Sequence, residues 1–181
     1  MSFFHGGGRA RVFWRLPEWM ICKPHCIVYS SVTGNTQTLA RFLAERLEIP
    51  LFSIAEAPNP ENYACLILGF WVIRGMPDPR MLRFMQTVRG KKVFFFCTHA
   101  AWPDSEHIQH LRDAVSHLLQ DQNNELLGFF SCQGRVHFSG HSAHHPMTPE
   151  RKHRLEEAAL HPNAEDCARA LAALAQSLGM Q

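Results

Sequence analysis

The sequence has little net charge of either sign, and this excludes a whole class of partners. Its 181 residues carry 18 Lys and Arg against 16 Asp and Glu, which gives a net charge of +2. Residues 1–24 alone carry a charge of +3, so the remainder, at −1, is close to neutral. Binding to DNA or RNA depends on clustered Lys and Arg that neutralise phosphates, and no such cluster is present. The sequence therefore argues against a nucleic-acid partner.

Long apolar runs are also missing. The longest, residues 64–72 and 93–97, fall far short of the roughly 20 residues that a helix needs to cross a bilayer. Residues 1–19 are basic but contain no apolar stretch followed by a small-residue cleavage site, so they are not typical of a secretory signal. We therefore expect no membrane span and a cytoplasmic location.

The cysteines show no pattern of a zinc site or a disulfide scaffold. Cys65, Cys97 and Cys132 lie in or at the end of apolar runs, where a free thiol serves as a small hydrophobic core residue. Cys22 and Cys26 have no second pair at zinc-finger spacing, so they are a weak metal signal. We expect buried free thiols.

What the sequence does contain is an alternation of apolar, β-rich segments with helical patterns, which predicts an α/β fold with a parallel sheet covered by helices on both faces. Unbroken apolar runs are typical of strands buried on both sides. We expect strands at residues 26–30, 51–54, 65–70, 92–97 and 126–131, and helices at residues 34–47, 79–88, 105–119, 148–160 and from 163 onward. Residues 1–24 are expected to form a mobile or partly packed extension to a single domain, residues 25–181.

The loop after the first strand carries the strongest chemical signal. Ser31, Thr33 and Thr36 place three hydroxyls around Gly34, where a helix begins. Free N–H groups and the helix dipole favour an anion there, and Ser or Thr side chains add donors. The loop has neither the lysine of a nucleoside triphosphate loop nor the Gly-x-Gly-x-x-Gly of dinucleotide folds. A phosphate monoester fits best; the alternative is that these side chains only cap the helix.

Residues 27–47, IVYSSVTGNTQTLARFLAERL, resemble the first strand, phosphate loop and first helix of flavodoxins. The resemblance implies a flavodoxin-like, doubly wound five-stranded parallel sheet of strand order 2-1-3-4-5. It also implies FMN as the cofactor. In that case the phosphate would lie in the loop of Ser31, Val32, Thr33, Gly34, Asn35 and Thr36.

Residues 70–75 and 97–104 fall where flavodoxins place the two loops around the flavin ring. In such sheets the ligand lies beyond the carboxyl ends of the strands, so these loops meet at one crevice. Trp71 and Trp102 are candidates to stack on the ring, although each could be an ordinary core tryptophan. The other candidates in these loops are Phe70, Val72, Arg74, Gly75, Thr98, His99 and Ala100, and the strand after them adds Cys132, Gln133 and Gly134.

The carboxyl-terminal third departs in sequence from ordinary flavodoxins. Ordinary flavodoxins are also strongly acidic, and this chain is not. The motifs GFWV, AxPDSEH, CQG and HHPMTPER are similar to a divergent bacterial flavodoxin-like subfamily, one branch of which accompanies the reduction of bile pigments. His137, His141, His144 and His145 lie within nine residues. They could contact a metal, a haem or a bilin, or they could be surface histidines.

The leading functional hypothesis is a flavodoxin-like FMN protein that carries electrons to or from a redox protein partner, a reductase or an acceptor enzyme. No side chain need act as nucleophile or base, because the flavin supplies the redox chemistry. The alternative is an FMN-dependent reductase or a tetrapyrrole-binding protein that uses the histidine-rich crevice. This alternative would require a second, substrate-sized pocket over the flavin.

Overall fold

The fold is a twisted sheet between two layers of helices. We describe residues 24–136 and 147–179 of a computed structural model. The main sheet has the order β2-β1-β3-β5-β6, with parallel neighbours throughout. Its strands are β1 (His25–Tyr29), β2 (Leu51–Ser53), β3 (Cys65–Ile73), β5 (Lys92–His99) and β6 (Glu125–Gln133). This is the predicted doubly wound order, which is confirmed.

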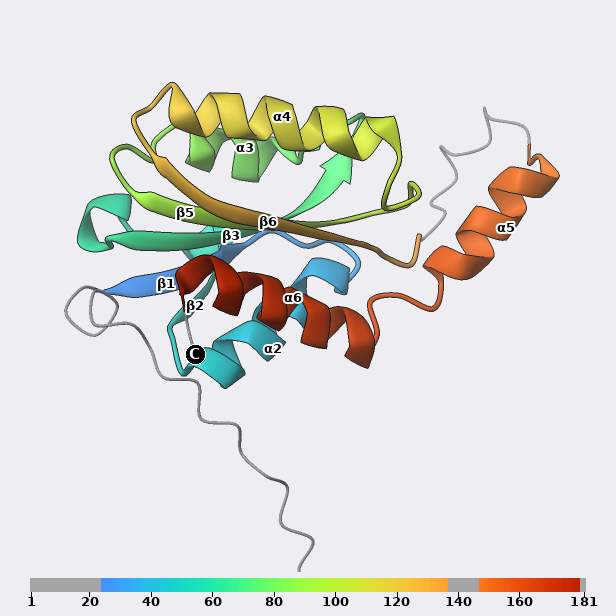
Figure 1. The fold of residues 1–181 in the computed structure, drawn as a ribbon, viewed down its shortest axis with the longest axis horizontal. Coiled ribbons are helices and arrows are strands. Elements are labelled where there is room, and N and C mark those ends of the chain that lie inside the picture. The colour runs from blue at the N-terminus through green and yellow to red at the C-terminus, as the bar shows by residue number, and fades with distance from the viewer. Residues whose placement is uncertain (1–23, 137–146, 180–181) are drawn as a thin grey trace, which may run out of the picture.

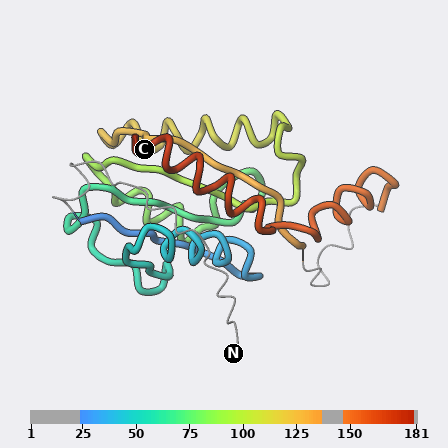
Figure 2. Tube along the Cα trace, turned by 60° about the horizontal axis from the view of Figure 1, so that its bottom comes forward, coloured from blue at the N-terminus to red at the C-terminus, as the bar shows by residue number. Residues whose placement is uncertain are grey.

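Two helices cover each face of the sheet (Figure 1). On one face lie α2 (Asn35–Leu47) and α6 (Ala164–Leu178), and on the other lie α3 (Pro79–Met85) and α4 (Glu106–Gln120). A further helix, α5 (Pro149–Ala158), lies outside both layers, beyond the carboxyl ends of the strands (Figures 1 and 2). The short crossover from β2 to β3 holds only two 3-10 turns, η1 (Ile54–Glu56) and η2 (Pro60–Asn62).

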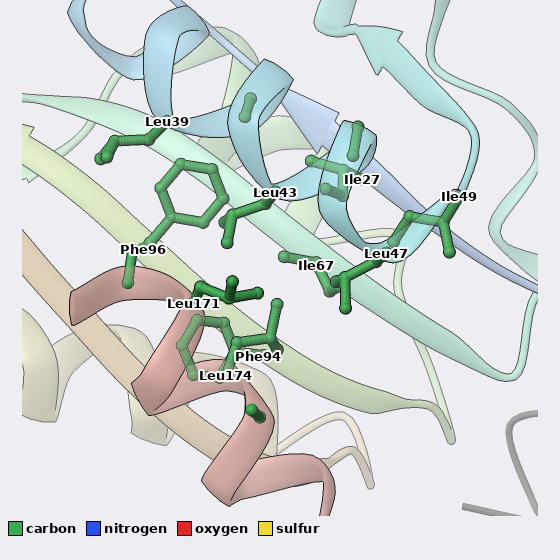
Figure 3. Close-up of a cluster of buried hydrophobic side chains, with 14 of the residues drawn as sticks. Ile27, Leu39, Leu43, Leu47, Ile49, Ile67, Phe94, Phe96, Leu171 and Leu174 are labelled. Carbon is green, nitrogen blue, oxygen red and sulfur yellow. The ribbon is translucent and has the colours of Figure 1, made fainter. Parts of the chain in front are cut away.

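The sheet separates two apolar cores because side chains alternate along each strand. Phe94 and Phe96 of β5 point to the α2 and α6 side, where Leu43 and Leu171 meet them (Figure 3). Phe95 points to the α3 and α4 side. The expected thiols Cys65, Cys97 and Cys132 are free and buried in these cores. The unbroken apolar strands therefore serve two cores at once.

Local sequence signals fix where the later helices begin. The Asp78 carboxylate accepts hydrogen bonds from the backbone N–H groups of Arg80 and Met81, at the start of α3. Thr148 caps α5 in the same way, followed by Pro149. Asn163 and Asp166 form a reciprocal capping box at α6. Among the described residues, no helix is long and apolar enough to cross a membrane.

The structure differs from the expected elements at the end of β3. This strand continues through Trp71 to Ile73 and then turns back through Arg74 and Gly75 into β4 (Met76–Pro77), which pairs with it antiparallel. Arg74 and Gly75 have φ values of 51° and 77°, as a two-residue hairpin turn requires. The first expected flavin loop is thus a strand end and a hairpin. Its bulky and β-branched residues favour extended backbone.

Three segments with predictions lie outside the described residues. They are the extension before Pro24, residues 137–146, which contain the four clustered histidines, and residues 180–181. Among the described residues, no group of three or more His, Cys, Asp or Glu side chains could hold a metal ion.

Candidate functional site: a two-ended crevice at the carboxyl edge of the sheet

Two adjoining hollows lie at the carboxyl ends of the strands. One, of about 300 Å³, lies over the first turn of α2 and the end of β6. The other, of about 420 Å³, lies between the β3–β4 hairpin and the start of α4. Val72 and His99 line both hollows. We call them the loop end and the hairpin end of a single crevice, whose combined size is in the range of small-molecule sites.

At the loop end, α2 begins without a side-chain cap. Gly34 precedes the helix with φ 89°, and no side chain bonds to the free N–H groups of the first turn. The Ser31 hydroxyl accepts a hydrogen bond from the Gly34 N–H at 3.2 Å, which tightens the turn before the helix. Uncapped N–H groups and the helix dipole attract an anion. No side-chain cap is present at the start of α2, and its free N–H groups suit a phosphate monoester.

Two contacts brace this loop against the rest of the crevice. The Asn35 amide donates to the Thr33 hydroxyl at 3.1 Å and to the Arg135 carbonyl at 2.8 Å. Gly134 makes this approach possible, because a Cβ there would lie 2.7 Å from the Asn35 amide nitrogen. The phosphate loop is thus tied to the end of β6.

The Thr36 side chain points inward, away from the expected phosphate position. It is fully buried, and its hydroxyl lies 2.8 Å from the hydroxyl of Thr98 on β5. Thr36 thus connects the phosphate loop to the end of β5, and only its backbone N–H remains for an anion.

At the hairpin end, the β3–β4 turn contacts the start of α4. A Cβ on Gly75 would lie 3.0 Å from the His107 ring, so that ring lies close against the turn. Trp102 is 42% exposed, which excludes an ordinary core tryptophan. Its ring centroid lies 5.8 Å from that of His153 on α5. This end therefore offers aromatic and flat surfaces to a planar ligand.

His99 joins the two ends and is uncharged at neutral pH. Its Nδ1 lies 3.1 Å from the Ala101 carbonyl oxygen, so Nδ1 carries the proton and Nε2 is left as an acceptor. Burial lowers the pKa of His99 to about 4; the bond to Ala101 opposes this shift, and nearby His107 adds to it. The buried Nε2 has no partner among the described residues.

Gln133 stands beside His99 on the neighbouring strand, in register with it. It is 4% exposed, and its amide nitrogen has no partner among the described side chains and backbone groups. Buried polar atoms without partners are rare and costly. An acceptor and a donor left open side by side indicate that this edge of the sheet is built for a ligand.

Most of the predicted site residues line the crevice: Val32, Thr33, Asn35, Trp71, Val72, Arg74, Gly75, Thr98, His99, Ala100, Trp102 and Gly134. Ser31, Gly34, Thr36 and Gln133 support its walls, as described above. Two predicted residues lie deeper. Phe70 is fully buried against Phe95, and Cys132 is buried in the core on the α2 and α6 side.

The crevice also includes residues that the sequence did not single out: Ala101, Ser105, His107, Arg135, Val136 and Arg154. Ala101, Ser105 and His107 lie in or beside the AxPDSEH motif, so their position was a usable signal. His107 is exposed and also lines the hairpin end. Nothing in the sequence near Arg154 pointed to the site.

The fold and the site define a class: a doubly wound α/β protein with an uncapped helix terminus and an aromatic crevice at the switch point of strand order. The model of the flavodoxin domain family matches residues 26–175. The chain therefore belongs to that family, which confirms the resemblance and supports FMN as the cofactor.

Individual relatives agree with this assignment. The chain is 25% identical over 155 residues to the flavodoxin-like domain-containing protein BilS of Clostridioides difficile (strain CD3), covering 77% of this chain and 88% of the relative. Oxidised flavodoxin 2 of Bacillus cereus matches with a TM-score of 0.57 at 18% identity, over 86% of this chain and 97% of that one. Flavodoxin 1 of the same species matches with a TM-score of 0.50 at 17% identity, over 81% and 97%.

Proposed function

We propose that the protein binds FMN in the two-ended crevice and transfers electrons to or from a redox protein partner. The observation that carries the proposal is that one crevice joins an uncapped helix terminus to a flat aromatic hollow. A flavin mononucleotide has a phosphate at one end and a planar ring at the other. Membership of the flavodoxin domain family supports the same ligand.

Different residues would hold the phosphate and the ring of FMN. The α2 N–H groups and the Thr33 hydroxyl would hold the phosphate, and the Asn35 amide would keep the loop in place. Trp102 and the hairpin would contain the ring, and Trp71, which lines the loop end, would meet it from that side. The open atoms of His99 and Gln133 could bond to its polar edge. When bound, FMN supplies the reversible electron chemistry. Trp102 at 42% exposure keeps that end within reach of a partner.

Cytoplasmic location and a soluble redox partner belong to the same proposal. The alternative, a reductase or tetrapyrrole-binding protein, depends on His137, His141, His144 and His145, which lie outside the described residues. No described residue favours it over electron transfer.

The test compares FMN with riboflavin, which lacks the phosphate. The purified protein is titrated with each flavin, and binding is followed by quenching of flavin fluorescence. We expect FMN to bind at least a hundredfold more tightly, because the charged hydrogen bonds of the phosphate are worth about 1.5–3 kcal/mol each. Equal affinities would overturn the phosphate site. An absence of binding for both would overturn the flavoprotein function.

A second measurement addresses electron transfer. The FMN-loaded protein is reduced without oxygen and mixed with a protein acceptor, and the flavin absorbance is followed in time. Reoxidation by the protein acceptor without any small-molecule substrate is the expected result. Reoxidation only when an organic substrate is added would favour a reductase instead.

A further inference from the structure

The hairpin end contains a cation, and one of its nitrogens has no partner among the described residues. Arg154 of α5 lines this hollow, and its Nε is shielded from water without a hydrogen-bond partner among the described residues. In a buried site, a charged group without hydrogen-bond partners costs more free energy than a neutral group without them. No described residue that lines the hollow supplies a partner for this atom.

Helix α5 is held against the site by several contacts, so Arg154 is not a loose surface side chain. The His153 ring meets the ring of Trp102, and the Arg135 guanidinium donates to the Ala159 carbonyl at 3.2 Å. Ala158 is fully buried. It lies four residues after Arg154, and residues at this spacing share one face of a helix. The buried face of α5 therefore carries Arg154 to the crevice.

The hairpin end is positive. Arg74 and Arg154 are always charged, and no Asp or Glu lies among the described residues that line it. Asp104 and Glu106 are near in sequence, but both are exposed and neither lines the hollow. His99 is neutral, as argued above. A ligand at this end thus meets two positive side chains and, among the described lining residues, no negative one.

We propose that Arg154 raises the reduction potential of the flavin bound in this crevice; this inference rests on the proposed function. Full reduction takes two electrons from the redox partner and one proton from water, which leaves the ring with one negative charge. A cation beside the ring favours that charged form over the neutral oxidised form. The effect acts at short range, because Arg154 lines the hollow that would hold the ring and its Nε is shielded from water.

The experiment measures the midpoint potential of the FMN-loaded protein by spectroelectrochemical titration. The variants are Arg154→Gln, which removes the charge, and Arg154→Lys, which keeps it. Lys152→Gln is the control, because Lys152 lies on the same helix, has a side chain 68% exposed and does not line the crevice. Affinities for FMN and riboflavin are measured in parallel, and near-ultraviolet circular dichroism checks that Trp102 keeps its environment.

We expect Arg154→Gln to weaken binding of the reduced flavin at least tenfold relative to the oxidised flavin. For a two-electron couple this is a potential about 30 mV more negative. Arg154→Lys should retain most of the wild-type potential, and Lys152→Gln should match the wild type. The ratio of FMN to riboflavin affinity should stay constant, because Arg154 does not contact the loop end.

A wild-type potential in FMN-loaded Arg154→Gln would overturn the inference, as would an equal shift in Lys152→Gln. If Arg154→Gln disturbs the Trp102 signal, Arg154→Lys decides: a potential as low as that of the Gln variant would show that the charge is not the cause. These results concern only the ring and leave the FMN proposal standing. A wild-type protein that binds no FMN would instead overturn the proposed function, and this inference with it.

Discussion

Thr33 is the residue at which the phosphate end can be tested most directly. Its exposed hydroxyl accepts from the Asn35 amide and keeps its own proton free to donate. Thr33→Ala should weaken FMN by roughly one to two powers of ten, since one hydrogen bond to a charged group is lost. Riboflavin affinity should not change. Fluorescence titration with both flavins measures this.

Thr33→Ser is the matched control, because it keeps the hydroxyl and removes only a methyl group. Its FMN affinity should stay within a few-fold of the wild type. The phosphate role of Thr33 would be contradicted by Ala and Ser variants of equal affinity.

Trp102 tests the other end of the crevice. Trp102→Leu should weaken FMN and riboflavin by the same factor, roughly three- to tenfold, because an aromatic pair contributes about 0.5–1.5 kcal/mol beyond its buried area. The visible spectrum of the flavin should shift as well. Trp102→Phe keeps a ring and should preserve most of the affinity. A loss confined to FMN would mean that Trp102 acts at the phosphate and not at the ring.

For single residues, the sequence predicted which residues belong to the site better than it predicted where their side chains point. Thr33 and Asn35 lie in the crevice as expected, because the turn before α2 leaves them on its surface. Thr36 turns inward because it opens the buried stripe of α2, which continues at Leu39 and Leu43. That stripe was visible in the sequence, but the Thr98 partner, 62 positions away, was not.

Among the helices, α6 depends on a buried carboxylate at its first turn. Asp166 is fully buried and bonds to His161, the Asn163 N–H and Arg169. Burial alone would raise the pKa of Asp166, but these hydrogen bonds outweigh it and hold the pKa below its ordinary value of 3.8. A carboxyl with a lowered folded-state pKa stabilises the fold above its unfolded pKa. It loses that contribution as the pH falls through the folded value.

Asp166→Asn should therefore lower the free energy of unfolding at pH 7 by about 3 kcal/mol, the scale of breaking a buried charged network. It should also remove part of the fall in stability below pH 3.8. Urea unfolding at several pH values measures both effects. Glu165→Gln is the control: Glu165 lies in the same first turn but is exposed, and its loss should cost less than about 1 kcal/mol.

A fall in stability of equal size in both variants would point to the helix dipole as the cause. A buried Asp166 network would then have no special role.

The elements themselves were largely predictable, and the exceptions have physical reasons. Unbroken apolar runs marked all five parallel strands, and Asp78, Thr148 and Asn163 marked three helix starts. The β3–β4 hairpin was missed because its turn places Arg74 at positive φ, where glycine or asparagine is the usual signal. The place of α5 beside the crevice was missed because the contacts that hold it come from Trp102 and Arg135, far away in sequence.

For the molecule as a whole, the near balance of charge governs association with a partner. With a net charge of +2, long-range steering should be weak, so the electron-transfer rate should depend only mildly on salt. Stopped-flow reduction by a flavodoxin reductase at about 20 and about 300 mM salt should give rates within roughly threefold of each other. A strongly acidic flavodoxin measured alongside serves as the reference, because its electron-transfer rate should fall steeply with salt. An equally steep fall in rate for this protein would contradict the expectation.

The contact of Asn35 with Arg135 has a consequence for how the cofactor comes and goes. Asn35 holds the carbonyl of Arg135, and the guanidinium of Arg135 holds the last turn of α5. These two hydrogen bonds, from Asn35 through Arg135 to Ala159, connect one wall of the crevice to the other, and we call them the latch. Because coupling between two sites is reciprocal, a ligand that orders the loop also favours the closed latch. We therefore expect cofactor exchange to be slow, with its rate set by unlatching rather than by diffusion.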